Sequence, residues 1–376
     1  MTSSASTPDH VLAELSAGGI GLITLNRPKA LNALSLGMIR ALTAALNAWR
    51  DDPAVKAVAI RGMGKGHEGV PAPFGAFCAG GDIRFFHEAA LAGDAALEAF
   101  FTEEYALNHL IHQYPKPYIA FMDGIVMGGG MGISQGASLR VVTERTKMAM
   151  PETRIGLFPD VGGGYFLSRL PGHLGEYLAL TGHVLSGGEP VTARLADGLL
   201  ASDELPRVWQ HLADTAWDSG TAAQHWVQSQ LQMPAEDRLP HAGQIDAVFG
   251  LPGVADMLAA LDQAGTDWAR HAAEDLRTRS PLMLHVALEQ VRRARGMGLA
   301  DDLRMERDLV YRCFHLRPGD ASETVEGIRA LAVDKDHAPR WNPPAVAGVS
   351  AEMVAPFFIS PWDKSAHPLA GLRDTA

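Results

Sequence analysis

Residues 118–132, YIAFMDGIVMGGGMG, carry the strongest indication of the fold. The apolar start, Tyr118 to Met122, predicts a buried β-strand, and the glycine-rich run at 127–132 predicts a turn and the start of a helix. At such a start, backbone N–H groups can approach a ligand closely, and the helix dipole favours negative charge. The segment therefore suits an oxyanion, although close packing or a tight turn is the plainer explanation of one isolated glycine run.

Two other known motifs fit this region poorly. Glycines at 128 and 130 would need a third at 133 to form a dinucleotide-binding fingerprint, and that position is Ile133. The run from Gly132 to Gly136 matches the G-x-S-x-G pattern of a hydrolase nucleophile elbow. That elbow needs a strand before Ser134 and a helix after it, whereas here a helix start precedes Ser134 and a strand-like segment follows. We therefore predict neither a dinucleotide site nor a serine nucleophile.

A second run of small residues, FCAGGD at 77–82, precedes a predicted helix at 83–91. Asp82 stands where it could cap that helix or interact with its dipole. Because an oxyanion hole commonly needs two backbone donors that converge on one oxygen, two such helix starts in one half of the chain favour an oxyanion site more than either does alone.

Two carboxylates lie eight residues apart, Glu152 and Asp160, in a loop with Pro151 and Pro159 near its ends. If the loop folds back, one acid can serve as base or nucleophile while the other positions a hydroxyl or water. The alternative is that both acids cap the helix that follows near residue 161. The residues alone leave both interpretations open.

Strand-like and helix-like patterns alternate through the first half of the chain, which predicts an α/β fold. Beyond residue 206 the pattern becomes mainly helical. We predict an N-terminal tail at 1–17, a core at 18–205 and a helical C-terminal region at 206–376. The expected strands are 20–25, 55–61, 118–122, 139–142 and 147–150, and the expected helices are 36–49, 83–91, 95–112, 254–261, 268–277 and 282–294.

Composition limits the classes of function. The chain has 376 residues, 47% hydrophobic and 20% charged, which is typical of a globular protein, and its net charge of −11 argues against a nucleic-acid partner. Cys78 and Cys313 are too few for a disulfide framework, so we expect a reducing compartment, the cytoplasm. We predict no secretory signal and no membrane span. His109 and His112 lack a nearby third ligand, so we predict no metal site.

Taken together, the motifs resemble the crotonase (enoyl-CoA hydratase/isomerase) superfamily over residues 18–197. The motifs that carry this resemblance are LNRPKALNAL at 25–34, the run at 77–82, Asp123-Gly124 with 128–132, and Pro151-Glu152 with Gly156. Within the superfamily the chain is most similar to the 3-hydroxyisobutyryl-CoA hydrolases. That likeness rests on Glu103-Glu104-Tyr105, 150–153, 156–166, 280–282, 334–336 and 339–341.

The resemblance implies a crotonase-type ββα spiral core with a mainly α-helical C-terminal region. It also implies that the N–H groups of Gly81 and Gly129 hold the thioester oxygen. Four positions match residues that the hydrolase subgroup uses for substrate and catalysis: Glu104, Gly129, Glu152 and Asp160. The residues implied at the CoA site are Lys29, which could meet a phosphate, Ala30, Leu31 and Ala79, whose backbone would lie near the adenine.

The implied reaction is hydrolysis of a 3-hydroxyacyl-CoA, in particular 3-hydroxyisobutyryl-CoA to 3-hydroxyisobutyrate and CoA in valine catabolism. Glu152 would attack the thioester or activate water. Asp160, with Glu104 nearby, would hold the 3-hydroxyl and protonate the thiolate. No cofactor is implied, because CoA is part of the substrate, and a homo-oligomer is left open.

Two other functions remain to be weighed against hydrolysis. An enoyl-CoA hydratase or isomerase would use the same scaffold, but typical hydratases carry a glutamate where this chain has Gly132. A CoA-binding protein without turnover would need the glycines and Lys29 but not the carboxylates.

Overall fold

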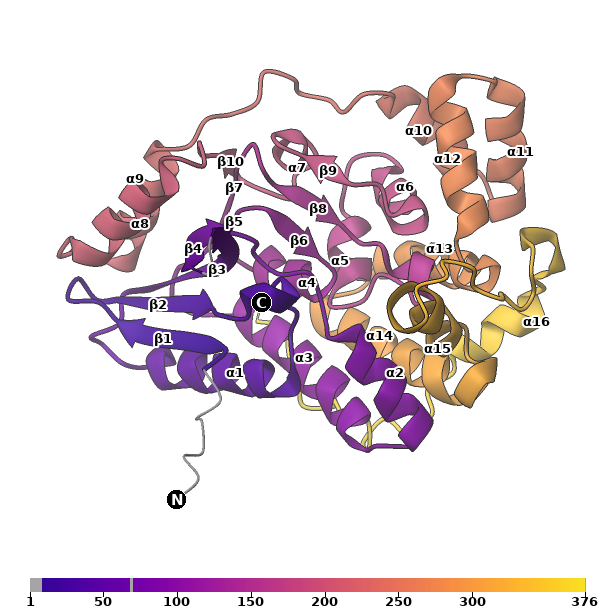
Figure 1. Ribbon diagram of the computed structural model, residues 1–376, viewed down its shortest axis with the longest axis horizontal. Coiled ribbons are helices and arrows are strands. Elements are labelled where there is room, and N and C mark those ends of the chain that lie inside the picture. The colour runs from indigo at the N-terminus through magenta and orange to yellow at the C-terminus, as the bar shows by residue number, and fades with distance from the viewer. Residues whose placement is uncertain (1–8, 68–69, 376) are drawn as a thin grey trace.

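The computed structural model describes residues 9–67 and 70–375. At its centre is a seven-stranded sheet in the order β1-β2-β3-β5-β7-β10, with β4 paired to β3 outside that path (Figure 1). β2, β3, β5, β7 and β10 are parallel, whereas β1 and β4 run antiparallel to their partners. The strands are β1 (Val11–Leu15), β2 (Ile20–Leu25), β3 (Ala57–His67), β4 (Val70–Gly75), β5 (Tyr118–Met122), β7 (Leu139–Val142) and β10 (Gly198–Leu199).

A smaller sheet alternates with the large one along the chain. It contains β6 (Ile125–Met127), β8 (Lys147–Ala149) and β9 (Leu185–Ser186), in the order β6-β8-β9. The chain passes from β5 to β6 and then to α4, and from β7 to β8 and then to α5, so these two turns each contribute one strand to each sheet before a helix follows. This is the ββα spiral that the resemblance implies, and the predicted fold class is confirmed.

Helices bury both faces of the large sheet. Along β5, Tyr118, Ala120 and Met122 join one buried cluster, while Ile119 and Phe121 join the other. The first cluster includes α1 (Leu36–Arg50) and α3 (Ala96–His112), and the second includes α8 (Leu205–Asp214) and α9 (Gly220–Ser229). Therefore α8 and α9, at the start of the predicted C-terminal region, cover the sheet of the core. The other helices of the first half are α2 (Ile83–Ala92), α4 (Gly129–Gln135), α5 (Gly163–Leu167), α6 (Leu174–Thr181) and α7 (Glu189–Thr192).

The remaining helices continue the same hydrophobic core. α13 packs against α5 and α6, and α14 packs against α3. Ser280 caps α13: its side chain accepts a bond from the Met283 N–H at 3.3 Å, and Pro281 occupies the first turn. These helices are α10 (Ala242–Phe249), α11 (Val254–Ala264), α12 (Asp267–Thr278), α13 (Pro281–Ala294), α14 (Leu299–His315), α15 (Glu323–Ile328) and α16 (Ala351–Val354).

The C-terminal tail docks on the body of the protein. Phe357 and Leu369 are buried, and Asp374 Oδ1 lies 3.2 Å from His109 Nε2. His109 is therefore a buried residue that contacts the tail. Within residues 9–67 and 70–375, no group of His, Cys, Asp and Glu side chains forms a metal-binding cluster. None of the helices in that part of the chain has the length and hydropathy needed to cross a membrane.

Candidate active site

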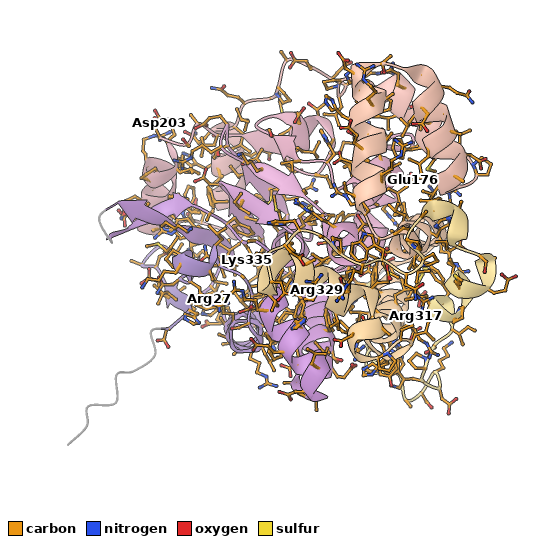
Figure 2. All side chains as sticks on the ribbon, turned by 45° about the vertical axis from the view of Figure 1, so that its right-hand side comes forward. Arg27, Glu176, Asp203, Arg317, Arg329 and Lys335 are labelled. Atoms are coloured by element: carbon orange, nitrogen blue, oxygen red, sulfur yellow. The ribbon has the colours of Figure 1, made fainter. Side chains whose placement is uncertain are left out.

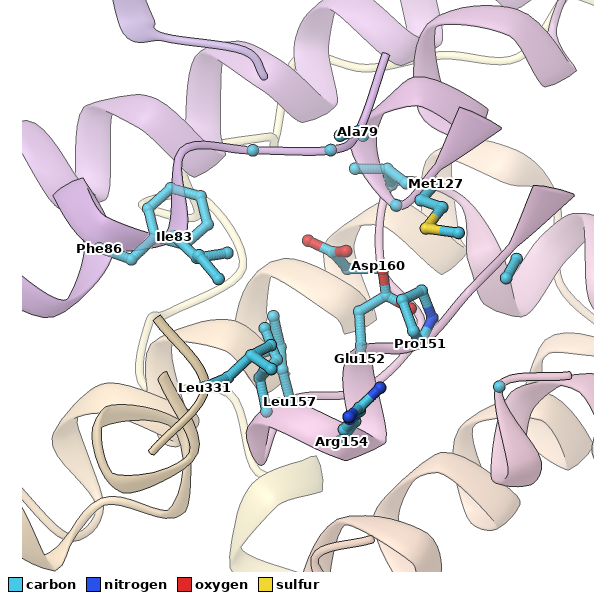
Figure 3. Close-up of a pocket in the computed structure, with 18 of the residues that line it drawn as sticks. Ala79, Ile83, Phe86, Met127, Pro151, Glu152, Arg154, Leu157, Asp160 and Leu331 are labelled. Carbon is cyan, nitrogen blue, oxygen red and sulfur yellow. The ribbon is translucent and has the colours of Figure 1, made fainter. Parts of the chain in front are cut away.

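A cavity of about 630 Å³ lies between the spiral core and the C-terminal helices (Figure 3). The carboxyl groups of Glu104, Glu152 and Asp160 all face it. Apolar side chains form much of the remaining wall, and Leu331 and Arg279 enter from the C-terminal region. The larger apolar residues of the wall are Ile83, Phe86, Phe101, Met127, Ile155, Leu157, Val161, Val184 and Leu331.

The two glycine-rich helix starts meet at this cavity. Gly81 lies just before α2, and Gly129 is the first residue of α4. A Cβ atom added to Gly129 would lie 3.4 Å from the Gly81 nitrogen, so the two backbones are neighbours. Over the described residues, neither N–H has a hydrogen-bond acceptor in the protein. The structure therefore brings the two predicted donors together and leaves both available to a ligand.

Asp82 does not cap α2 with its side chain, in contrast to one of the roles expected for it. It stands at the N-cap position, but its carboxylate pairs with Arg27 at 2.9 Å. Arg27, labelled in Figure 2, also donates to the Ala33 carbonyl at 3.0 Å. Asp82 thus ties the loop before α2 to the 25–34 motif, a partnership across 55 residues that local spacing does not reveal.

Glu152 approaches the glycine run directly. It begins the short 3₁₀ helix η2 (Glu152–Ile155), and its side chain is 6% exposed. A Cβ atom on Gly128 would lie 2.7 Å from Glu152 Oε1, so only glycine lets the carboxylate come this close. Glu152 Oε2 is buried and has no hydrogen-bond partner among the residues that the structure describes. This unsatisfied oxygen is available for a substrate or water.

Asp160 enters the same cavity from the end of the loop, and Figure 3 shows its carboxyl group and that of Glu152 in one pocket. The Tyr105 hydroxyl donates to Asp160 Oδ2 at 2.8 Å. Asp160 does not cap α5, because the N-cap of that helix is Gly162. The capping interpretation of Asp160 is therefore wrong. Tyr105 belongs to the quoted 103–105 motif but was not predicted as a site residue, and its only signal was its position next to Glu104.

Burial and mutual repulsion keep protons on this group of acids. Burial raises the pKa of Asp160 to about 7, although the Tyr105 bond acts in the opposite direction. Burial raises the pKa of Glu152 well above its usual range, and the Asp160 charge adds to that effect. The pKa of Glu104 is raised by burial and by the charges of Asp160 and Glu152. The group can therefore hold a proton near neutral pH, as acid and base chemistry requires.

The predicted CoA residues fall into two sets. Ala79 lines the cavity, and its N–H donates to the Leu31 carbonyl at 3.0 Å. Lys29 and Ala30 belong to the short 3₁₀ helix η1 (Pro28–Ala30) beside Leu31, and Lys29 is exposed. Lys29, Ala30 and Leu31 do not line the cavity, so their contact with CoA stays a prediction. Asp275 and Arg279 also form part of the cavity wall, and no sequence motif predicted them.

Ser134 has the environment of an ordinary helix residue. It lies inside α4, is fully buried, and its hydroxyl donates to the Gly130 carbonyl at 2.8 Å. Its hydroxyl is therefore engaged within the helix and does not stand on a strand-to-helix elbow.

The two-sheet spiral and the neighbouring glycine amides agree with what the crotonase resemblance implies. The profile of the enoyl-CoA hydratase/isomerase family matches residues 20–358. The chain belongs to that family.

Relatives named 3-hydroxyisobutyryl-CoA hydrolase, mitochondrial, support this assignment. The one from Xenopus tropicalis is 40% identical over 350 residues, 92% of this chain and 87% of the relative. The one from Homo sapiens is 37% identical over 366 residues, 96% of this chain and 91% of the relative. Those names place the relatives in mitochondria, while a cytoplasmic location for this chain stays a prediction.

Solved structures agree on the fold. A carnitinyl-CoA dehydratase from Mycobacterium thermoresistibile has a TM-score of 0.83 at 40% identity and covers 94% of this chain and 97% of its own. An enoyl-CoA hydratase from Rhodobacter sphaeroides 2.4.1 has a TM-score of 0.81 at 36% identity and covers 94% of this chain and 98% of its own. These two proteins are named for dehydration and hydration, whereas the relatives above are named for hydrolysis, so the site must decide between these reactions.

Proposed function

We propose that this protein hydrolyses the CoA thioester of a 3-hydroxyacyl group, in particular 3-hydroxyisobutyryl-CoA, to give 3-hydroxyisobutyrate and CoA. The observation that carries the proposal is the placement of Glu152 and Asp160 in one cavity beside two glycine amides that have no acceptor among the described residues. The names of the relatives that are 37% and 40% identical support the same reaction. Valine catabolism is the pathway that we assign to it.

In this proposal Gly81 and Gly129 form the oxyanion hole. Their N–H groups would bind the thioester oxygen as it becomes negative during attack on the carbonyl carbon. Preorganised backbone donors in a water-excluded site need no reorganisation at that moment, which is why they stabilise the transition state effectively. Nearby, the backbone of Ala79 would contact the adenine part of CoA and Lys29 a phosphate.

Glu152 would drive the attack by one of two routes. It can add to the carbonyl carbon itself, forming an anhydride that water then hydrolyses, or it can take a proton from a water molecule that attacks directly. Both routes break the carbon–sulfur bond and use the same oxyanion hole. The unsatisfied Glu152 Oε2 supplies the oxygen that either route needs.

Asp160 would bind the 3-hydroxyl of the substrate and give a proton to the departing thiolate. Its pKa of about 7 lets it hold that proton at neutral pH. Glu104, whose Oε1 is buried without a partner in the described part of the chain, would accept a second bond from the substrate.

Hydration of a double bond fits the site less well. It ordinarily occupies two carboxylates, and typical hydratases carry the second one at the position of Gly132. A Cβ atom at Gly132 would lie 2.6 Å from Val161 Cβ and 2.9 Å from Asn108 Nδ2. A carboxylate side chain at this position would displace Val161, which directly follows Asp160. The site therefore lacks the second acid that hydration ordinarily uses.

The test compares CoA release from 3-hydroxyisobutyryl-CoA and isobutyryl-CoA, measured with a thiol reagent. A buried group that pairs with the substrate hydroxyl discriminates strongly against an analogue that lacks it. We therefore expect faster release from the hydroxylated substrate, and a smaller difference between the two substrates in Asp160→Ala. Equal rates with the parental protein would contradict the role of Asp160, and no thiol release from either would contradict hydrolysis.

A further inference from the structure

The loop that carries Asp160 is hydrogen-bonded to two helices of the C-terminal region. Glu306 of α14 accepts bonds from the N–H groups of Gly162 at 2.7 Å and Gly164 at 2.9 Å. Gln290 of α13 donates to the Pro159 carbonyl at 2.7 Å and to Glu306 Oε1 at 3.0 Å. Figure 1 shows α5, which this loop enters, together with α13 and α14, and both helices contact it.

This loop needs external support because its backbone is strained. Val161 directly follows Asp160 and has φ of 57°, a left-handed conformation that β-branched residues rarely adopt. Such a conformation persists only when the surrounding structure holds it. The next residue, Gly162, is also left-handed, at φ 86°. The strained turn aims the Asp160 side chain into the cavity.

The helix that follows cannot anchor the turn by itself. α5 has only five residues, and its N-cap, Gly162, has no side chain to bind the free N–H groups. Two carboxylates from α14 replace that cap: Glu306 binds Gly162 and Gly164, and Asp302 Oδ2 accepts from the Tyr165 N–H at 2.9 Å.

Glu306 does not line the cavity in which the reaction would take place. It is fully buried, it is absent from the lining of the cavity, and each of its carboxyl oxygens already accepts an N–H bond. Its influence on catalysis therefore comes from holding the loop that carries Asp160, together with the charge interaction between the two carboxyl groups.

We propose that Glu306, supported by Gln290, is a positioning residue that fixes the direction of the Asp160 carboxyl group. The C-terminal helices then complete the active site as well as the hydrophobic core. The kinetic part of this inference rests on the proposed function, whereas its structural part does not.

The decisive variant is Glu306→Gln, which keeps the size of the side chain but replaces one accepting oxygen with an N–H donor. We expect kcat for CoA release to fall about 10²-fold, the effect of a small misplacement of a catalytic group, with little change in KM. By hydrogen exchange, the peptide covering 159–168 should lose protection. The matched control is Glu176→Gln. Glu176, labelled in Figure 2, is a buried carboxylate of α6 that pairs with Arg295 and His173.

The control separates positioning from general destabilisation. Glu176→Gln should retain kcat and the protection of 159–168 even if its melting temperature falls. Equal losses of kcat and loop protection in both variants, or parental values in Glu306→Gln, would overturn the proposal.

A second variant keeps the proposal testable if Glu306→Gln does not fold. Gln290→Met removes the donor to Pro159 and Glu306 while nearly conserving volume, so we expect a smaller loss of kcat and of loop protection in the same peptide. Unchanged kcat and exchange in Gln290→Met would contradict the inference. If the parental protein released no CoA, the proposed function would fail, while hydrogen exchange at 159–168 would still decide whether Glu306 holds the loop.

Discussion

At the scale of single residues, this site depends on where a few buried acids keep their protons. Asp160 and Glu152 face one cavity, and burial raises the pKa of both. Only Asp160 accepts a bond from a tyrosine hydroxyl, that of Tyr105. The Tyr105 bond favours the ionised form of Asp160, so the proposed roles, attack by Glu152 and proton donation by Asp160, require the proton that the two acids share to lie on Asp160.

Glu152→Gln tests the first of these roles. The amide keeps the size of the side chain but can neither attack nor accept a proton, so we expect kcat to fall by about 10²–10⁴ with little change in KM. Steady-state CoA release measures both constants. Glu103→Gln is the control, because the Glu103 carboxylate pairs with Arg40 at 2.8 Å at the surface. A near-normal kcat in Glu152→Gln would remove Glu152 from the mechanism.

Tyr105→Phe tests the second role through pH. The Tyr105 hydroxyl stabilises the ionised form of Asp160, so its loss should raise the Asp160 pKa above about 7. If protonated Asp160 is the active form, activity falls as pH rises through that pKa, and the falling limb of the kcat profile should move to higher pH. Tyr118→Phe is the control, because within the described residues the buried Tyr118 hydroxyl has no partner. An identical falling limb in all three proteins would contradict this role.

The sequence predicts the site residues that belong to short motifs, and it does not predict their distant partners. Glu152, Asp160 and the glycines stand in compact patterns whose chemistry is readable from residue type. The bond from the Gly162 N–H to Glu306 spans 144 residues, and the bond from the Tyr105 hydroxyl to Asp160 spans 55. No local pattern encodes such contacts, because they exist only once the helices have packed.

At the scale of elements, the two glycine-rich helix starts must converge to form the proposed oxyanion hole. A Cβ atom on Gly129 would lie 2.6 Å from Glu104 Oε1 and 3.2 Å from Leu34 Cδ1. We expect Gly129→Val to reduce the rate of CoA release by about 10²–10³, the effect of losing one oxyanion donor.

The control for this prediction is Gly243→Val. Gly243 lies in α10, where an added Cβ would meet no atom within 4 Å. This variant should release CoA at the parental rate. If Gly129→Val folds, as judged by circular dichroism, and is as active as the control, the proposed hole is in the wrong place.

Helices that begin with a capping serine, and strands made of a continuous run of apolar residues, were predictable from the sequence. Helices α1 and α13 follow serine caps, and β5 is buried at every residue. Strand β1, which falls within the predicted tail, was missed because it lies at the sheet edge with four of its five residues exposed. Strand β6 was missed because it has only three residues between two glycine turns, and β4 was missed as well.

At the scale of the whole molecule, the buried Asp160 makes the stability of the fold depend on pH. The folded pKa of Asp160 is about 7, above its ordinary value of 3.8. The folded state therefore holds a proton that the unfolded chain has lost, and this contribution to stability disappears as pH rises from about 4 to about 7. Asp160→Asn removes the cost of ionising a buried acid at higher pH.

The expected gain in the free energy of unfolding is a few kcal/mol above about pH 8, at about 1.4 kcal/mol per pKa unit. Thermal unfolding of parent and Asp160→Asn measures it: the gain in melting temperature should be larger at about pH 8 than at about pH 5. An equal difference at both pH values would mean that Asp160 is not held protonated by burial.

The central claim is that this member of the enoyl-CoA hydratase/isomerase family cleaves a thioester instead of hydrating a double bond. One assay of the purified protein tests it, following thiol release from 3-hydroxyisobutyryl-CoA and enoyl absorbance with crotonyl-CoA in parallel. With one glutamate at the shared position and no space for a second at Gly132, we predict rapid release of CoA and little loss of enoyl absorbance. Rapid hydration of crotonyl-CoA without thiol release from 3-hydroxyisobutyryl-CoA would contradict the claim.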